Sequence, residues 1–296
     1  TPVFIHLNLP QQDLHYYNMP NLVTVVGRNT HILPHMLKHY EGKVEKNYVV
    51  VYRQSEDDKI LEEIEELGIT PYKVVTEPKF NWEQVTHLYN EVKRSKPNDW
   101  WIVSDDDELQ VYPRSIEDIV YKCERHGYTF VTGGFLDRIG SNGTFPKVTV
   151  ETNLHKAFPN AGFFRYPMSG ANPNKVTLMK GSVDLVPGQH YAIVDGKNSW
   201  GTKHKHRMPI EDVFVQVHHF KWDASVLGRI LEVANTKKDY TFWEEYGKMY
   251  ESISKENNQI NIKNNEYLVE ELNNSSYIEY KDYPHWDKLI KTITNI

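Results

Sequence analysis

The sequence predicts an α/β protein with a largely parallel central sheet that is covered by helices on both faces. Between residues 20 and 133, short apolar segments rich in β-branched and aromatic residues alternate with segments whose apolar residues recur at helical spacing. The strand–helix unit is repeated four times and is followed by a fifth strand, which is the pattern of a parallel sheet. The length of 296 residues and the apolar content of 39% also allow a substantial hydrophobic core.

Five strands are expected in this half because each is a short, nearly continuous apolar run, as in a sheet that is buried on both faces. They span residues 22–26, 48–52, 72–75, 100–103 and 128–132. In sheets of this kind, ligands bind at the carboxyl ends of the strands, so the residues after each strand are the first candidates for a site.

Each interval between these strands carries the signals of a helix. Apolar residues of the first helix recur at i, i+3, i+4 and i+7 from Leu33 to Tyr40. The other three helices are bounded by a capping pair at Ser55–Asp58, a cap at Asn81 and a stop at Gly127.

The second half of the chain has a weaker pattern. Residues 134–174 are rich in Gly, Asn, Pro and Phe and are expected to form long loops. Further strands are expected at 175–186, 191–194 and 213–220, and helices from 224 onward, near 241–254 and near 284–294. No internal repeat and no clear linker divides the chain.

Composition and charge argue against several classes of protein. The net charge of −6 disfavours a general nucleic-acid or anionic-membrane binder, because these need a basic surface. The single cysteine, Cys123, lies on the apolar face of an expected helix and is interpreted as a buried structural thiol. No run of 18 or more apolar residues and no basic-then-apolar leader is found, so we expect a cytoplasmic protein without a transmembrane segment.

The first strand runs into Gly27-Arg28-Asn29-Thr30. This turn contains neither of the glycine-rich phosphate-binding motifs, GxGxxG or GxxxxGK[ST]. A dinucleotide dehydrogenase or a P-loop NTPase therefore loses its main support.

An acidic run follows the fourth strand, in the stretch WWIVSDDDELQVYP at residues 100–113. Side chains alternate along an extended chain, so Asp105 and Asp107 point the same way and could together bind a hard divalent cation such as Mg²⁺ or Mn²⁺. The alternative is a solvated acidic loop. The buried strand before the run and its place at a strand end favour the metal site.

Two further clusters carry candidate functional residues. The strand VFVQVHHFKW ends in His218 and His219, which face opposite sides, so one is a candidate ligand and the other a candidate core histidine. Asp137 and Arg138 lie between two turns and could form a structural ion pair or belong to a site. The basic segment 203–207 could bind phosphate, although a solvated face explains it as well.

Several segments in order make the chain resemble glycosyltransferases of the family 2 and family 92 type, which have the Rossmann-like, nucleotide-sugar-binding GT-A fold. The segments are LVTVVGRNTHILPHMLKHY, YVVVYRQSEDD, EQVTHLYNEVKRSKPNDWWIVSDDDEL with its DxDE motif, FLDRIGSNGTFP and VHHFKW. The resemblance covers roughly residues 20 to 235 and does not extend beyond 240. It implies a GT-A domain at 1–235, with a nucleotide-sugar half at 20–133 and an acceptor half at 134–235, and a helical C-terminal extension at 236–296 packed on it.

The resemblance also assigns site residues. The metal ligands for Mn²⁺ or Mg²⁺ would be Asp105, Asp107 and His219, with His218 in reserve. Nucleotide-binding positions would be Arg28, Asn29, Arg53, Asp58, Gln84 and Asp106. Positions for the sugar or the acceptor would be Gly134, Arg138, Trp200 and Lys221. Asp106 could instead be structural, and Glu108 is expected to orient nearby groups.

The resemblance implies transfer of a hexosyl or deoxyhexosyl group from a UDP-, GDP- or dTDP-sugar to a glycan acceptor, with inversion at the anomeric carbon. The second strand ends in YRQSEDD rather than the family's usual acidic-Asn-Ser run, which leaves the base open. Asp137 is the candidate base, with Glu211 and Asp212 in reserve. The alternatives are a metal-dependent nucleotidyltransferase or phosphohydrolase, and a non-catalytic carbohydrate-binding module.

Overall fold

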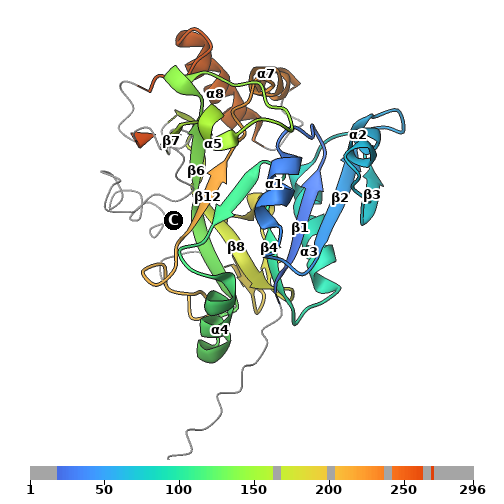
Figure 1. Cartoon of the computed structure of the whole chain (residues 1–296), viewed down its shortest axis with the longest axis vertical. Helices are drawn as coiled ribbons and strands as arrows, with labels where there is room; N and C mark the ends of the chain where they lie inside the picture. The colour runs from blue at the N-terminus through green and yellow to red at the C-terminus, as the bar shows by residue number, and fades with distance from the viewer. Residues whose placement is uncertain (1–18, 163–167, 199–203, 237–241, 263–267, 270–296) are drawn as a thin grey trace, which may run out of the picture.

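The structure is a computed structural model, which describes residues 19–162, 168–198, 204–236, 242–262 and 268–269. Among these residues, ten strands form one sheet (Figure 1). They are β1 Asn21–Val26, β2 Asn47–Arg53, β3 Lys73–Thr76, β4 Trp100–Val103, β5 Glu108–Val111, β6 Phe130–Ile139, β7 Asn160–Gly162, β8 Asn174–Lys180, β12 Val215–His219 and β13 Leu268–Val269. A small second sheet contains β9 Asp184–Leu185, β10 Ala192–Val194 and β11 Lys197–Asn198.

The helices of the described residues alternate with the strands in the first half of the chain. They are α1 Leu33–Tyr40, α2 Ile60–Glu66, α3 Trp82–Arg94, α4 Ile116–His126, α5 Leu154–Ala157, α7 Val226–Thr236 and α8 Trp243–Lys255, with short 3₁₀ turns η1 Ser141–Gly143 and η2 Pro187–Gln189. The caps expected at Asn81 and Gly127 are confirmed, whereas the capping pair expected at Ser55–Asp58 is wrong, because α2 begins at Ile60 after Lys59 and has no side-chain cap. Asn81 accepts hydrogen bonds from the backbone N–H groups of residues 83 and 84, and Gly127 ends α4 in the left-handed conformation.

The sheet topology confirms the predicted fold class. Strands β3, β2, β1 and β4 are neighbours in that order and run parallel. Strand β8 runs antiparallel between β4 and β6, and β12 pairs in parallel with β6. It follows that β1, β4, β6 and β12 all point the same way, and their carboxyl ends meet at one edge of the sheet.

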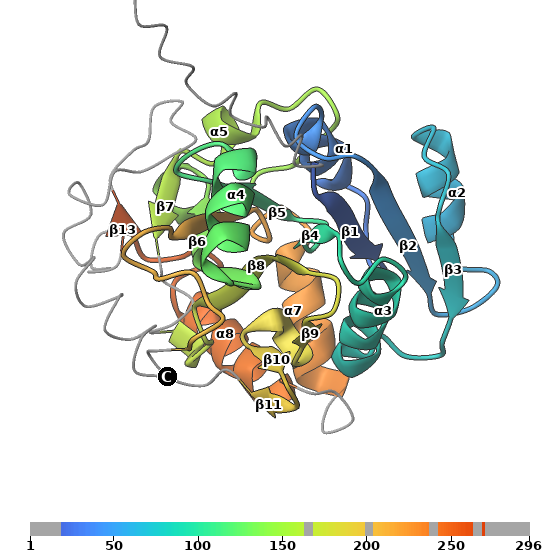
Figure 2. The same cartoon turned by 90° about the horizontal axis from the view of Figure 1, so that it is seen from below.

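Helices cover both faces of the sheet, as Figure 2 shows for α1 and α3. On one face, buried residues of α1, α2 and α4, including Cys123, belong to the same core as Val49 and Val51 of β2. On the other face, α3 and the β9–β10 segment pack against Val50 and Tyr52 of the same strand. Alternate residues of one strand thus enter two separate cores, which is why the strand reads as a continuous apolar run.

The prediction that residues 134–174 form long loops is wrong in part. Strand β6 continues through Asp137 and Arg138 to Ile139, and every residue of it is buried. The two charged residues and the Gly133–Gly134 pair hid this strand from the apolar pattern. Strand β7 and helix α5 also fall within the expected loop, and β5 was not expected.

The strand expected at 175–186 is two strands, β8 and β9, because the chain bends at Gly181. A Cβ atom at this position would lie 2.3 Å from the carbonyl oxygen of Lys96, so only glycine fits against the end of α3.

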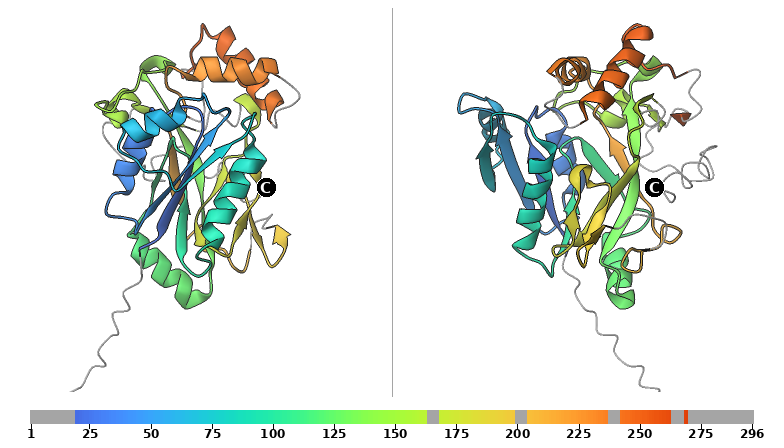
Figure 3. Two further views of the ribbon diagram at one scale, coloured as in Figure 1. Left: turned by 90° about the vertical axis from the view of Figure 1, so that its right-hand side faces the viewer. Right: turned by 180° about the vertical axis from the view of Figure 1, so that it is seen from behind.

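Two helices follow the sheet, as expected. Helices α7 and α8 pack on each other and lie over the end of the sheet at which β6 and β12 finish (Figure 3). Their shared core includes Val226, Ile230 and Met249 and reaches Ile139 and Trp222. The helix expected at 284–294 lies outside the described residues. Within the part of the chain that the structure describes, no helix is long and apolar enough to cross a membrane.

Candidate functional site

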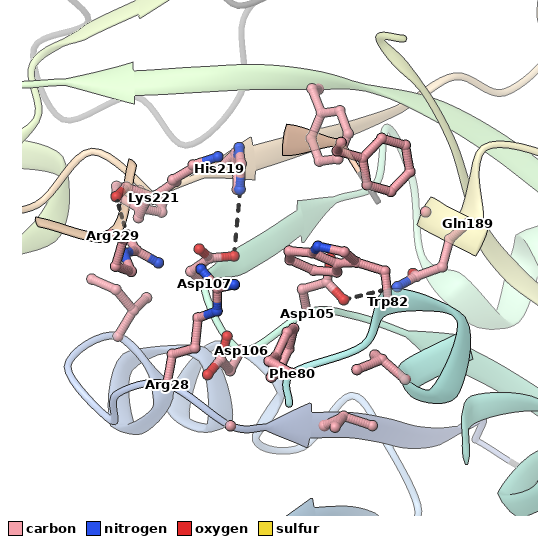
Figure 4. A pocket seen from close by; sticks show the side chains of 18 of the residues that line it. Arg28, Phe80, Trp82, Asp105, Asp106, Asp107, Gln189, His219, Lys221 and Arg229 are labelled. Atoms are coloured by element: carbon pink, nitrogen blue, oxygen red, sulfur yellow. Dashed lines mark hydrogen bonds and ion pairs between the residues drawn. The ribbon is translucent and has the colours of Figure 1, made fainter. Parts of the chain in front are cut away.

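A pocket lies at the edge where the carboxyl ends of the strands meet. Its walls come from the ends of β1, β4 and β12, the start of α3, the loop around η2, and helices α7 and α8. The acidic run Asp105–Asp107 lies in this pocket between β4 and β5, as Figure 4 shows. The sequence-based expectation that the run lies at the ligand-binding edge of the sheet agrees with this position.

Asp105 is held by three other side chains. Its Oδ1 atom accepts hydrogen bonds from the Tyr89 hydroxyl and from Nε2 of Gln189, both at 2.8 Å, and its Oδ2 atom lies 3.0 Å from the Lys175 ammonium. Lys175 also contacts Glu108 at 2.7 Å. Burial by itself raises the pKa of Asp105, but the charge of Lys175 and the Tyr89 hydrogen bond outweigh it and lower that pKa. Asp105 is therefore a charged, fully engaged carboxylate.

Asp107 faces the pocket beside His219. The Oδ1 atom of Asp107 lies 3.4 Å from Nε2 of His219, and the two side chains are 17% and 7% exposed. Burial raises the pKa of Asp107, but the neighbouring His219 outweighs this and lowers it. For His219, burial lowers the pKa, but the carboxylates of Asp107 and Asp137 outweigh this and raise it to about 9.

The sheet itself positions His219. In the strand pairing, His219 lies opposite Glu108 of β5 on one side and Asp137 of β6 on the other. Asp137 is 1% exposed, and its Oδ1 atom lies 2.9 Å from Nδ1 of His219 and accepts a hydrogen bond from the Trp222 indole at 3.1 Å. This contact fixes the imidazole ring with Nε2 toward Asp107.

This arrangement fits a divalent cation. Asp107, Glu108 and His219 each offer a ligand atom, and these atoms all lie within 4.8 Å of one another. A carboxylate that holds the far nitrogen of a ligating histidine is a common support for protein-bound metals. Glu108 already contacts Lys175 and the backbone N–H of Asp105, so Asp107 and His219 are the two side chains best placed to bind the cation.

His218 lies on the opposite face of β12 and is completely buried. Its Nδ1 atom accepts from Arg138 at 3.1 Å, because a guanidinium only donates, and its Nε2–H therefore donates to Gln216 at 3.2 Å. Arg138 is also buried and donates to the carbonyl of Phe158. Neither His218 nor Arg138 lines the pocket.

The predicted nucleotide-binding residues divide into two groups. Arg28, Asn29 and Asp106 line the pocket. Burial and the charges of its two neighbours raise the pKa of Asp106 well above the usual range. The other three, Arg53, Asp58 and Gln84, do not line it.

Those three have local contacts instead. Arg53 pairs with Glu56, and Asp58 accepts hydrogen bonds from the backbone N–H groups of residues 54 and 60. Gln84 lies in the first turn of α3.

The predicted catalytic and acceptor-binding residues also divide into those that line the pocket and those that do not. Lys221 lines the pocket, whereas Gly134, Asp137, Glu211 and Asp212 do not. Asp212 forms an ion pair with Lys122 of α4 at 2.9 Å, which lies at the opposite end of the sheet (Figure 1). Trp200 lies outside the described residues.

Several pocket residues could not be recognised from the sequence. They are Phe80, Trp82, Lys175, Gln189, Arg229 and Tyr246. Gln189 is 2% exposed and has a backbone φ of 59°, which is unusual for a residue other than glycine and is the one local sign of a constrained position. The others come from distant segments, and no spacing in the sequence relates them to the acidic run.

No protein-family model matches the sequence, and no curated protein matches it either. Solved structures with some similarity include a protein described as a glucose-1-phosphate thymidylyltransferase from Bacillus anthracis, with 11% identity, coverage of 43% of this chain and 58% of that chain, and a TM-score of 0.28. They also include TarS from S. aureus, with 12% identity, coverage of 73% and 39%, and a TM-score of 0.32. A third is a 4-diphosphocytidyl-2C-methyl-D-erythritol synthase, with 12% identity, coverage of 56% and 76%, and a TM-score of 0.28. The chain thus spans less than two thirds of the length of the first two, and at these values the similarity assigns no function.

Proposed function

We propose that this chain is a metal-dependent glycosyltransferase of the GT-A type. It would move a hexosyl or deoxyhexosyl group from a UDP-, GDP- or dTDP-sugar to a hydroxyl of a glycan or glycoconjugate. The observation that carries the proposal is the Asp107–His219 pair, which faces a pocket at the carboxyl edge of an α/β sheet, with His219 oriented by Asp137. The ordered sequence segments that resemble such enzymes support the same assignment.

Asp107 and His219 would hold Mn²⁺ or Mg²⁺, and Asp105 would remain bound to Lys175 as a fixed carboxylate beside it. The cation, when bound, supplies Lewis-acid stabilisation of the negative charge on the departing diphosphate. With a cation bound, Asp137 would accept a hydrogen bond from Nδ1–H of His219 and leave Nε2 as the electron-pair donor, which is the form a metal requires.

The proposed reaction breaks the bond between the anomeric carbon and the diphosphate oxygen and forms a bond from that carbon to the acceptor oxygen. The electron pair leaves with the nucleoside diphosphate, and the hydroxyl proton passes to a carboxylate and then to solvent. Asp137 already holds His219 and accepts from Trp222 in the core, so we assign it the positioning role. We assign the base to Glu245 of α8, a half-buried carboxylate on the pocket wall.

The first test is calorimetric titration of the full chain with UDP, GDP and dTDP, each with and without Mn²⁺. We expect one nucleoside diphosphate to bind only with the metal, and Asp107→Asn to weaken this binding at least tenfold. Asp118→Asn, an exposed aspartate on α4, is the matched control and should bind as the wild type does.

Two results would reject the proposal. One is nucleotide binding that depends neither on the metal nor on Asp107. The other is turnover of a nucleoside triphosphate and a sugar phosphate with release of pyrophosphate, which would indicate a nucleotidyltransferase instead.

A further inference from the structure

The two ends of the pocket differ in charge. In Figure 4, Lys221 and Arg229 lie on one side of Asp107, and Trp82 and Gln189 lie on the other. The first end, under α7 and α8, is cationic, and the second presents neutral polar and aromatic groups.

Arg28 lies between the two ends, because it stacks on Trp82 while its charge acts on the Tyr246 hydroxyl. Its guanidinium carbon lies 4.7 Å from the centre of the Phe80 ring and 5.4 Å from that of Trp82. Among the described residues it forms no hydrogen bond and no ion pair. Stacking on two rings orients a guanidinium while leaving its N–H groups available to a planar or tetrahedral anion.

Lys221 and Arg229 are each held by a hydrogen bond to a neighbouring segment. The Lys221 ammonium, on a residue that is only 5% exposed, donates to the Tyr246 hydroxyl at 3.1 Å. Arg229 donates to the carbonyl oxygen of Lys221 at 2.6 Å, and its buried Nε atom has no acceptor among the described residues. An unsatisfied buried donor on a charged group is costly, which indicates that a ligand completes this end.

Carboxylates also lie near these cations, and the charges of Arg229 and Lys221 help to lower the pKa of Asp107. Asp223 lies 3.9 Å from Arg229 but is bound more closely by His31, at 2.9 Å. Glu245 also lines this end. Burial raises the pKa of the Tyr246 hydroxyl, but the charges of Lys221 and Arg28 outweigh it and lower that pKa.

The neutral end suits a nucleoside. The Nε1–H group of Trp82 and the Oε1 atom of Gln189 are buried, and within the described part of the chain neither has a hydrogen-bond partner. The Nε2 group of Gln189 is bound to Asp105, so its Oε1 is the acceptor that remains for a ligand. A nucleotide that lies across Asp107 with its base at this end would leave the cationic end to the acceptor.

We propose that the acceptor carries a phosphate group near the hydroxyl that it offers, and that Arg28, Lys221 and Arg229 bind this phosphate. The assignment to the acceptor rests on the proposed function. The existence of a phosphate subsite is independent of the proposed function, because the three cations and the unpaired Arg229 Nε are present without metal or nucleotide.

The test is calorimetric titration of the full chain with inorganic phosphate, first without metal or nucleotide. We expect saturable binding that Arg28→Gln and Arg229→Gln each weaken about tenfold, the loss of one charge-assisted hydrogen-bonding group. Arg125→Gln, at an exposed arginine of α4, should bind phosphate as the wild type does. Arg28 has no hydrogen bond to lose, so its variant remains informative if Arg229→Gln does not fold.

The second titration uses protein saturated with Mg²⁺ and the nucleoside diphosphate that binds. Phosphate affinity within about threefold of that of the free protein supports an acceptor subsite. Mutual exclusion would overturn the proposal, because the cations would then serve the donor diphosphate. Absence of phosphate binding, or binding unchanged in both arginine variants, would also overturn it. The first titration needs no nucleotide, so it separates a failure of this proposal from a failure of the proposed function.

Discussion

At the residue scale, the contact between Asp137 and His219 explains why the two charged residues at the end of β6 are buried. Asp137 lies beside His219 in the parallel pairing of β6 and β12, and its carboxylate contacts the His219 ring on the side away from the pocket. An isolated buried carboxylate would destabilise the fold, but this one has two hydrogen-bond donors, His219 and Trp222. Arg138, its neighbour on the opposite face, is satisfied by Phe158 and His218.

We predict that Asp137→Asn weakens Mn²⁺ binding by about 10- to 100-fold, because His219 loses the carboxylate charge that raises its basicity. The measurement is a titration with Mn²⁺ followed by the paramagnetic broadening of ligand signals. Asp118→Asn is the control, with thermal unfolding recorded for both variants. Unchanged Mn²⁺ affinity with slower turnover would contradict the positioning role and favour a catalytic role for Asp137.

At the element scale, α7 and α8 contribute side chains both to a hydrophobic core and to the wall of the pocket. Tyr246 and Met249 lie one turn apart on α8, and Tyr246 faces the pocket while the completely buried Met249 packs in the core shared with α7. The position of the pocket wall therefore depends on how this helix pair packs against Ile139 and Trp222.

We predict that Met249→Ala lowers the free energy of unfolding by about 2–5 kcal/mol, through lost apolar burial and the cavity that remains. Urea denaturation monitored by circular dichroism measures this change. Lys248→Ala, on the exposed face of the same helix, should change stability by less than about 0.5 kcal/mol. Equal effects at the two positions would contradict the packing of α8 on α7.

The helices and strands that were predicted from the sequence are those whose own residues show the pattern, without reference to distant parts of the chain. Strand β4 was predicted at its observed bounds, because four consecutive apolar residues end at an acidic run. Strand β5 was missed because Glu108 and Gln110 are buried polar residues, satisfied by Lys175 and by the carbonyl oxygen of Val103. Lys175 lies 67 residues from Glu108 along the chain, so no short window of sequence contains both residues.

The same limit applies to the site. The alternation of side chains along a strand predicted that at most one of the two histidines is a ligand, and the family resemblance favoured His219. The structure places His219 in the pocket and His218 in the core. Gln189 and Arg229 reach the pocket only through the folding of the second half around β8 and β12. Their roles, like those of Asp105 and Asp107, remain predictions.

At the scale of the whole molecule, three histidines on the face away from the pocket make stability depend on pH: His218 is buried, and His39 and His155 are partly buried. Burial lowers the pKa of His39 to about 4, with Lys43 adding to the effect. Burial, and then the charge of Arg138, lowers the pKa of His155 to about 4 and that of His218 well below its usual value. The His155 and His218 rings lie 6.3 Å apart, and Nδ1 of His155 has no partner among the described residues.

We predict that the protein loses stability as the pH falls from about 6.5 toward 4. These histidines are neutral in the folded chain but take up protons in the unfolded chain once the pH passes below their usual pKa of about 6.5, so acid favours unfolding. Each proton taken up on unfolding lowers stability by at most about 1.4 kcal/mol per pH unit. Above pH 6.5 the three groups contribute no slope, because both states leave them neutral.

Thermal unfolding of the full chain between pH 8 and pH 4.5 measures this dependence. His39→Gln keeps a donor for the Gln110 carbonyl, which His39 contacts at 2.8 Å, but cannot take up a proton, so the fall below pH 6.5 should become shallower. His155→Gln should act in the same direction. His87→Gln, at an exposed histidine of α3, should leave the slope unchanged. If the wild type and all three variants show one slope, carboxylate protonation rather than this histidine cluster controls the acid transition.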